Sequence, residues 1–508
     1  MKKLTLFCLG LLSFSLMQAQ DINDALRYSQ NAIEGTARYR ALGGAFGALG
    51  GDLSALSSNP AGGAVFTQSN ATFTLAINDA TNDTNYFNGF GSISTNQTDL
   101  SQGGVVFVFK SNTNSPWQKF AVGVTYDRTN NFNNTWNASG TNTNDDGQFS
   151  NSITSYFYDY ADGLRLDEIS TLPGETYSDA YKAIGDFYGF ANQQAFLGFE
   201  SYLLEPEDIN NDANTVYYGN VAPGNFTHDY TYAATGYNGK ASFNLSTQYQ
   251  DNLYLGLNLN THFINYNRST ILYEDNNNPG SVVNYAEFNN TLSTTGSGFS
   301  FQLGGILKLG DSWRLGAVYD SPIWYNIDDE TTQYLATDGA NGFIEINPQV
   351  VNVYPTYKLQ TPSQFTGSVA YVFGQEGLIS FDYAVKDYSK TKFKPESDAF
   401  FSAQNNAMAN VLDVSQTYRL GGEYKIDQFS LRGGYRFEES PYKNGVTIGD
   451  LTGYSFGIGY NFGNTRLDLT YDKWDRTDNP SLYNVGLVDT ASVKRSNSNI
   501  IISLNLNI

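Results

Sequence analysis

Apolar and polar residues alternate along many short stretches of this chain. The first stretch covers residues 71–77, with Ala, Phe, Leu and Ile at alternate positions and Thr, Thr and Ala between them. Successive side chains of a β-strand point to opposite faces, so this period of two predicts a strand with one apolar face. Residues 500–508 repeat the pattern with Ile, Ile, Leu, Leu and Ile. These two segments predict the first and last strands of an all-β fold.

Similar strands between these two come in pairs, separated by short turns rich in Gly, Asn, Asp or Ser. Tight turns of this kind predict β-hairpins. Long polar connections join one pair to the next, beginning with an Asn/Thr-rich loop expected up to about Ser101. Six pairs, with the first and last strands, predict fourteen strands; the pairs are 105–109 with 120–126, 241–249 with 253–263, 299–309 with 314–319, 364–373 with 378–388, 417–426 with 429–437, and 454–462 with 465–471.

The strand expected over residues 253–263 shows what its two faces meet. One face carries four leucines and the other carries polar side chains, namely Leu253, Leu255, Leu257 and Leu259 against Tyr254, Asn258, Asn260 and His262. Apolar-out and polar-in alternation is typical of a transmembrane β-barrel, whose sheet must close because lipid offers no partner to unpaired backbone. We therefore predict a 14-stranded antiparallel transmembrane β-barrel with both termini on the side of the short turns. A soluble β-sandwich would not need a strand that is apolar to its last residue.

Composition supports one barrel rather than two or three soluble domains in 508 residues. Charged residues make up 16% of the chain, whereas soluble domains carry roughly a quarter. Aromatic residues reach 15%, which suits strands with aromatic girdles at both membrane interfaces. The net charge of −21 argues against nucleic-acid binding. We expect this negative charge in the loops and the lumen.

An unusual run of small residues, 35–63, precedes the first strand. Paired glycines recur in it, first at Gly43-Gly44. Asp52 stands where it would cap a short helix over residues 53–56, which Asn59-Pro60 would then end. The run has too few large apolar side chains for a core of its own, so we expect it to lie inside another structure. A flexible linker is the alternative, although linkers rarely interleave Ala and Leu with Gly.

This run ends in Asn59-Pro60-Ala61 just before the first strand, and it resembles the N-terminal hatch of the FadL/OmpP1/TodX family of outer-membrane transporters. Two later patterns also resemble the family, LGAVYDSP from Leu315 and LRGGYRF from Leu431. The resemblance implies a barrel plugged by a hatch that passes long-chain fatty acids, aromatic hydrocarbons or other hydrophobic compounds without ATP. It further implies that the hatch is a gate, which is held by weak contacts and shifts when ligand enters. The alternative is a permanent plug. The gate residues would be Gly43, Gly44, Asp52, Asn59, Pro60 and Ala61.

The first 19 residues predict a signal peptide. Lys2 and Lys3 form its basic start, and residues 4–16 form an apolar segment too short to cross a bilayer as a helix. The only cysteine, Cys8, would leave with it. We therefore expect a signal peptide at 1–19, a hatch at 20–68 and a barrel at 69–508, in the outer membrane of a Gram-negative bacterium.

The longest connection between expected strands runs from about residue 129 to about 237. Aromatic and aliphatic residues recur at helical spacing over residues 177–204, and Pro206 follows, which predicts an amphipathic helix in an extracellular loop. Its apolar stripe either packs the loop onto the barrel mouth or lines a hydrophobic capture site. In the second case the candidate ligand contacts are Phe187, Phe190, Phe196 and Phe199.

A kink in the third strand of the FadL/OmpP1/TodX family opens a lateral exit to the membrane. Gly123 is the candidate for such a kink in this chain, because glycine weakens a strand and permits a bulge.

No enzymatic pattern accompanies the two histidines, His228 in an expected loop and His262 at a lumen-facing strand position. The sequence has no HExxH or P-loop motif. Two His and three Met offer few axial ligands for haem, so we expect no cofactor and no metal. The expected partners are a hydrophobic small molecule, outer-membrane lipid and lipopolysaccharide, and the barrel-assembly machinery. A general porin and a non-transporting adhesion or assembly barrel are the competing functions.

Overall fold

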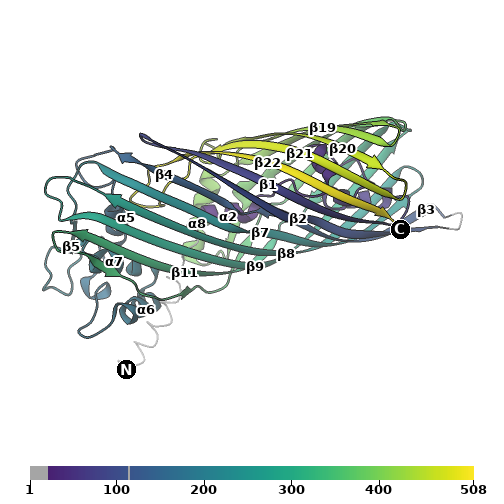
Figure 1. The fold of residues 1–508 in the computed structure, drawn as a ribbon. Helices are drawn as coiled ribbons and strands as arrows, with labels where there is room; N and C mark the ends of the chain where they lie inside the picture. The colour runs from purple at the N-terminus through teal and green to yellow at the C-terminus, as the bar shows by residue number, and fades with distance from the viewer. Residues whose placement is uncertain (1–20, 112–114) are drawn as a thin grey trace, which may run out of the picture.

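The computed structural model describes residues 21–111 and 115–508. The predicted signal peptide with Cys8, and part of the turn predicted near residues 112–116, lie outside the described residues. Twenty strand segments form one sheet that closes into an elongated barrel (Figure 1). Several segments share a neighbour and are pieces of one wall strand; for example, β3 (Trp117–Asn131) and β4 (Asn134–Asn142) both pair with β7 (Phe226–Tyr249). Counted in this way, the wall has fourteen antiparallel strands over the described ranges, as predicted.

The other wall strands follow in chain order. They are β1 (Asn70–Tyr86), β2 (Gly89–Lys110), β8 (Leu253–Asp275), β9 (Val283–Leu309), β10 (Trp313–Asp320) with β11 (Trp324–Gly339), β12 (Ile344–Ile346) to β15 (Gln364–Phe373) through β13 (Asn352–Val353) and β14 (Tyr357–Gln360), β16 (Gly377–Asp387) with β17 (Lys392–Lys394), β18 (Val414–Ile426), β19 (Phe429–Glu438), β20 (Leu451–Asn461), β21 (Thr465–Asp478) and β22 (Ser492–Asn507). The barrel closes where β1 pairs with β22, from Asn70 opposite Asn507 to Asn85 opposite Ser492. No open edge therefore faces the membrane along this seam.

The two faces of the wall follow the predicted alternation. On β8, Leu255 and Leu259 are exposed to the outside, whereas Asn258 and His262 are buried in the lumen. Aromatic side chains form two bands around the outside of the barrel. The band near the short turns contains Trp117, Tyr249, Trp313, Tyr371, Phe373, Phe429, Tyr460 and Phe462. The second band lies farther along the strands and contains Tyr126, Tyr237, Phe263, Phe299, Trp324, Phe365, Tyr383, Tyr418, Phe437 and Tyr454. These bands are the girdles expected from the Tyr and Phe content.

The Asn/Thr-rich loop predicted up to Ser101 is wrong. β1 and β2 instead continue as one hairpin whose ladder runs to Tyr86 opposite Gly89. This part lies beyond the aromatic bands, where both faces of a strand can meet water. Apolar alternation is therefore not needed there, and the sequence pattern of a half-buried strand is missing.

The loop predicted over residues 129–237 is also shorter and differently built. Strands β3 and β4 occupy the start of the predicted loop, and β7 occupies its end. His228 therefore lies on a strand and not in a loop. The single predicted helix is two helices, α6 (Tyr177–Tyr188) and α7 (Phe190–Glu200), because Gly189 between them has φ +93°. The loop domain further contains α5 (Ile153–Ala161), η3 (Leu166–Glu168), β5 (Leu204–Pro206) and β6 (Tyr217–Gly219).

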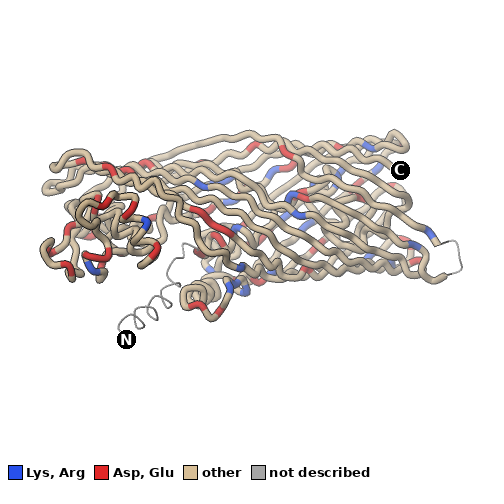
Figure 2. Tube along the Cα trace, turned by 90° about the horizontal axis from the view of Figure 1, so that it is seen from below, with Lys and Arg blue, Asp and Glu red and all other residues tan. Residues whose placement is uncertain are grey.

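This loop domain covers the barrel end opposite the C-terminus (Figure 1). Its helices share one apolar core with the upper wall strands, which includes Phe157, Tyr181, Phe196, Leu272 and Phe288. Acidic positions gather at this end (Figure 2), as expected for a chain with net negative charge. Among the described residues, no helix is long and apolar enough to cross a membrane.

Candidate functional site: a plugged barrel with a cavity above the plug

The N-terminal region lies inside the barrel and consists of short helices joined by glycine-rich turns. These are α2 (Ile22–Ser29), α3 (Ala37–Ala41), α4 (Leu53–Ser58) and η2 (Pro60–Val65). Asp52 caps α4 by accepting a hydrogen bond from the Ser54 amide, and the helix ends at Asn59-Pro60, close to the prediction. Gly43 and Gly44 form the turn after α3 with φ of +62° and +78°, a conformation that favours glycine. We call residues 35–65 the seated hatch.

The Asn59-Pro60-Ala61 motif ties the seated hatch to the wall. The Asn59 amide donates to the Gly47 carbonyl within the hatch at 2.7 Å and to the Gly305 carbonyl on β9 at 3.1 Å. Its Oδ1 accepts from the Ala61 amide at 3.1 Å. The Pro60 carbonyl accepts from the Asn244 side chain on β7 at 2.9 Å. Each buried hydrogen bond of this kind stabilises the seated state by roughly 1 kcal/mol.

Glycines on the inner face of the wall allow backbone and side-chain atoms of the hatch to approach closely. A Cβ atom at Gly304 would lie 2.0 Å from Asn59 Oδ1, and one at Gly316 would lie 2.1 Å from the Gly47 carbonyl oxygen. At five more wall glycines a Cβ atom would lie 2.2 to 2.6 Å from the nearest hatch atom; these are Gly123, Gly256, Gly421, Gly434 and Gly457. The wall is therefore shaped to the hatch. The sequence analysis does not predict this fit, although glycines at lumen-facing positions of otherwise regular strands are a signal for it.

Buried ion pairs also hold the hatch, which contradicts the expectation that only weak contacts hold it. Arg38 Nε lies 2.7 Å from Glu423 Oε2 on β18. Arg40 pairs with Asp472 on β21 at 2.6 Å and with Glu34 at 3.0 Å. Burial lowers the pKa of the Arg38 guanidinium, but the carboxylates of Glu423 and Asp52 outweigh burial and raise this pKa above its usual value. Arg38 therefore stays charged.

The wall partners form a connected network below the hatch. Arg432 on β19 lies between Glu423 at 3.3 Å and Asp468 at 2.7 Å. Arg466 joins Asp468 at 2.8 Å to the hatch residue Asp52 at 3.4 Å. A charge in a confined interior is stable only with close partners, so removing one member leaves another uncompensated.

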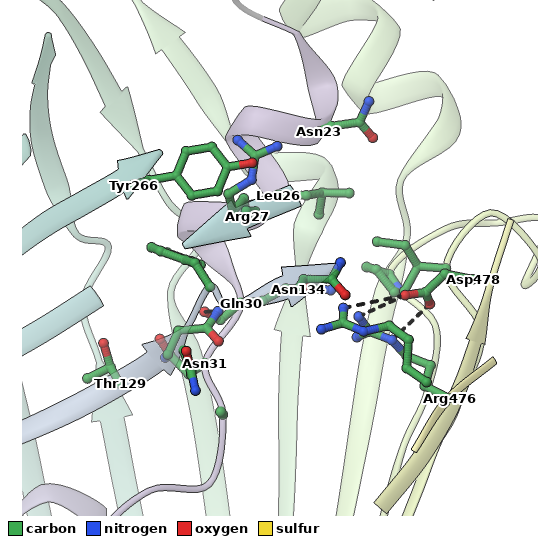
Figure 3. A pocket seen from close by; sticks show the side chains of 18 of the residues that line it. Asn23, Leu26, Arg27, Gln30, Asn31, Thr129, Asn134, Tyr266, Arg476 and Asp478 are labelled. Atoms are coloured by element: carbon green, nitrogen blue, oxygen red, sulfur yellow. Dashed lines mark hydrogen bonds and ion pairs between the residues drawn. The ribbon is translucent and has the colours of Figure 1, made fainter. Parts of the chain in front are cut away.

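A cavity of about 1650 Å³ lies between the seated hatch and the loop domain. α2 projects into it, and Arg27, Gln30 and Asn31 line it (Figure 3). Lys386 on β16 donates a hydrogen bond to the Ser29 carbonyl, and the Ala32 amide donates to the Thr129 carbonyl on β3 at 2.8 Å. We call residues 21–34 the upper hatch; it faces the cavity, whereas the seated hatch forms the floor.

The wall beside the cavity has a break in its hydrogen-bonded ladder. β2 and β3 pair only from Lys110 opposite Lys119 to Gln102 opposite Asp127. Beyond this point β3 has a register shift against β7 between Arg128 and Asn130. Residues 95–97 of β2 line the cavity at the break, and an ion pair of 2.5 Å between Arg128 and Asp99 crosses it.

A family model described as outer membrane protein transport protein (OMPP1/FadL/TodX) matches residues 209–507, more than half of the chain. The chain belongs to this family. Membership in the OMPP1/FadL/TodX family confirms the outer-membrane location, and makes the chain a transport channel for hydrophobic compounds rather than an enzyme. The hatch motif lies outside the matched residues, so its place in the lumen is known from the structure.

Solved structures of the OMPP1/FadL/TodX kind share the fold. A Pseudomonas aeruginosa FadL homologue is similar with TM-score 0.54 at 12% identity, covering 94% of this chain and 99% of that chain. The P. putida toluene transporter TodX gives 0.51 at 13%, and the CymD monoaromatic hydrocarbon channel gives 0.50 at 12%; both comparisons cover 94% of this chain and 99% of the other. A search of curated proteins finds no match.

The four phenylalanines proposed as ligand contacts lie in different surroundings within this family member. Phe190 lines the cavity. Phe196 is fully buried in the core of the loop domain and Phe199 packs against that core. Phe187 is 71% exposed on the outside of α6. The structure therefore brings only Phe190 to the cavity, and a role in binding for any of the four stays a prediction.

Gly123, the proposed kink of the FadL/TodX type, lies in an unbroken part of the ladder. It pairs with Val106 on one side and Asn244 on the other. A Cβ atom there would lie 2.4 Å from Leu56 Cδ2 of the hatch. The register shift lies five residues later, at Arg128, so a role of Gly123 in an exit stays a prediction.

The two histidines have different surroundings. His262 lines the cavity, where its Nε2 lies 2.8 Å from Ser300 Oγ. His228 is buried outside it, between Tyr86 OH at 2.9 Å and Glu274 Oε2 at 2.8 Å. Glu274 also accepts hydrogen bonds from Ser152 Oγ at 2.5 Å and the Ile153 amide at 2.7 Å. Glu274 thus fixes the start of α5 to the wall. Within residues 21–111 and 115–508, no group of three or more His, Cys, Asp or Glu side chains could hold a metal ion.

Proposed function

We propose that this chain takes up hydrophobic small molecules, such as long-chain fatty acids or aromatic hydrocarbons, and releases them sideways through the barrel wall at the second, outer aromatic band. The observation that carries the proposal is the combination of a large cavity, a floor fixed by buried ion pairs, and a ladder break between β2 and β3 beside that cavity. A solute in the cavity would meet a closed floor but an interrupted wall. The driving force would be transfer of apolar surface out of water, about 25 cal/mol per Å².

In this proposal the upper hatch is the gate, and Gly43, Gly44, Asp52, Asn59, Pro60 and Ala61 anchor the part that stays in place. The contact between Ala32 and Thr129 joins the upper hatch to β3 next to the ladder break. A ligand that displaces α2 would therefore loosen the same segment of β3 that borders the exit. The relatives named as a toluene transporter and a monoaromatic hydrocarbon channel support small apolar cargo for this chain.

Uptake into liposomes that carry the purified barrel tests this proposal. We would measure labelled oleate, labelled toluene and labelled sucrose, with the intact chain and with a variant that lacks residues 21–63. Saturable uptake of oleate or toluene with exclusion of sucrose, and sucrose entry only in the deletion variant, is the expected result. Sucrose flux through the intact chain would instead indicate a general porin. No flux of any solute would favour an adhesion or assembly barrel and overturn the proposal.

A further inference from the structure

More cationic than anionic side chains line the cavity, in contrast to the composition of the whole chain. Among the described residues, ten of the chain's 29 Lys and Arg line it, but only seven of its 50 Asp and Glu. Three of the ten, Arg27, Arg40 and Arg128, pair with the carboxylates of Asp24, Asp472 and Asp99, which do not line the cavity. The cations that can attract an anion are therefore those without a carboxylate partner.

Arg268 on β8 lines the cavity without a carboxylate partner. It forms no ion pair with any residue that the structure describes, and its Nε has no hydrogen-bond partner. Its neighbour Arg27 is paired with Asp24 at 2.5 Å and lies 4.2 Å from the ring centre of Tyr266. Asp21 is the other nearby carboxylate, but its Oδ1 caps α2 by accepting from the Asp24 amide at 3.0 Å.

A second pair of arginines, Arg476 and Arg495, also lines the cavity; Figure 3 shows Arg476 apart from Arg27. Arg476 and Arg495 share the single carboxylate of Asp478, at 2.8 Å and 3.7 Å. Arg495 Nε has no hydrogen-bond partner. Tyr232 lies beside the first group of arginines, because its OH is 2.9 Å from the OH of Tyr266, the ring that Arg27 covers.

Aromatic rings lead from this place to the loop domain. Tyr232 stacks on Trp136 with ring centres 5.4 Å apart and planes at 13°. The run continues through Tyr230, Tyr483, Tyr156, Tyr160 and Phe190, with successive ring centres 5.0 to 6.0 Å apart, and all of these residues line the cavity. Ring faces favour flat aromatic ligands through offset and edge contacts, which a flexible acyl chain does not reproduce.

We propose that the preferred ligand of this cavity is an aromatic compound with one anionic group. Its anion would bind Arg268, with Arg495 opposite, and its ring would lie along the rings from Tyr232 to Tyr483. This inference rests on the proposed function, because it names the class of molecule that the same cavity admits.

Binding to the full chain in lipid nanodiscs, measured by isothermal titration calorimetry, tests the inference. The probes are 2-naphthoate, neutral 2-methylnaphthalene and dodecanoate. We expect 2-naphthoate to bind tightest, because neither other probe satisfies both the arginines and the rings. R268Q should weaken the binding of 2-naphthoate about ten- to a hundredfold, which corresponds to the loss of a hydrogen bond to a charged group. It should leave the binding of 2-methylnaphthalene unchanged. R268K should restore part of the loss.

The matched control is R165Q, since Arg165 is exposed on the loop domain, pairs with Asp167 and does not line the cavity. W136L should weaken the binding of 2-naphthoate and leave the binding of dodecanoate unchanged. Heat-resistant migration of each variant in gels would show that it is folded. Equal binding of 2-naphthoate by R268Q and the intact chain would overturn the inference, as would tighter binding of dodecanoate that W136L does not change. Toluene or oleate uptake by liposomes would then still support the proposed function, whereas its loss would remove both.

Discussion

The Nε atom of Arg38 in the hatch donates a hydrogen bond to Oε2 of Glu423 in the barrel wall over 2.7 Å. Both side chains are almost fully buried. Glu423 is also approached by Arg432, so one carboxylate compensates a hatch cation and a wall cation. The hatch is thus an ion-paired part of the lumen and not a loose insert.

We expect E423Q to loosen the seated hatch. Breaking a buried pair by removing one partner costs about 3–5 kcal/mol, because the remaining charge is left uncompensated. Hydrogen exchange of residues 35–65 should therefore become faster by a factor that corresponds to this energy. The control is E376Q, at an exposed position in a short turn. An exchange rate equal to that of the control would contradict the clamping role of Glu423.

N59A should make the barrel leaky to small polar solutes. The substitution removes the hydrogen bonds to the Gly47 and Gly305 carbonyls and from the Ala61 amide, which together stabilise the seated hatch by roughly 2–4 kcal/mol. Liposome swelling in sucrose measures the leak. N267A, on an exposed position of β8, should stay as tight as the unmodified chain. A tight N59A barrel would mean that the motif does not hold the plug.

G316A should prevent normal seating of the hatch, because its Cβ would lie 2.1 Å from the Gly47 carbonyl oxygen. The matched control is G367A on the adjacent strand, opposite Ala317 in the ladder, where a Cβ meets nothing within 4 Å. We expect G316A to give less folded barrel in gel-shift assays, or a folded barrel that leaks sucrose, and G367A to behave like the unmodified chain. Identical behaviour of the two variants would refute the fitted contact.

E274Q should release the start of α5 from the wall. Glu274 accepts from Ser152, from the Ile153 amide and from His228, and the neutral amide would have to donate to one of these donors. Losing a buried charge-assisted bond costs about 1.5–3 kcal/mol. Hydrogen exchange in residues 152–161 should accelerate at least tenfold, while residues 35–65 stay protected. E287Q, at a partly exposed wall position, serves as the control.

The sequence predicts the wall well where lipid imposes alternation. Every strand pair inferred from period-two patterns is found, because a strand such as β8 must present Leu255 to lipid and Asn258 to the lumen. The pattern disappears where both faces meet water, and the upper hairpin of β1 and β2 was therefore missed. The break at Gly189 was missed because the apolar spacing of α6 continues into α7 while only the backbone turns.

The candidate site was harder to predict than the wall. Asn59-Pro60-Ala61 could be identified because capping and helix-breaking are local properties. The partners of the hatch could not, since Arg38 and Glu423 are 385 positions apart and only barrel closure brings them together. A usable signal existed in charged residues at lumen-facing positions between apolar ones, such as Asp468 between Leu467 and Leu469. Such positions are costly unless paired.

In the proposed mechanism, cargo leaves through the wall between β2 and β3 while the hatch floor stays in place. Cysteines at positions 99 and 128, D99C with R128C, can be joined by a short reducible cross-linker where the ion pair now crosses the break. The chain's only cysteine, Cys8, lies in the predicted signal peptide. The control pair, V105C with V124C, joins ladder partners below the break, where the wall is already closed.

Uptake of labelled oleate by liposomes would be measured before and after reduction. We predict that the 99–128 cross-link lowers uptake to the level of empty liposomes, that reduction restores it, and that the control cross-link has no effect. Uptake that is unchanged by the 99–128 cross-link would show that cargo passes elsewhere, and would contradict the account.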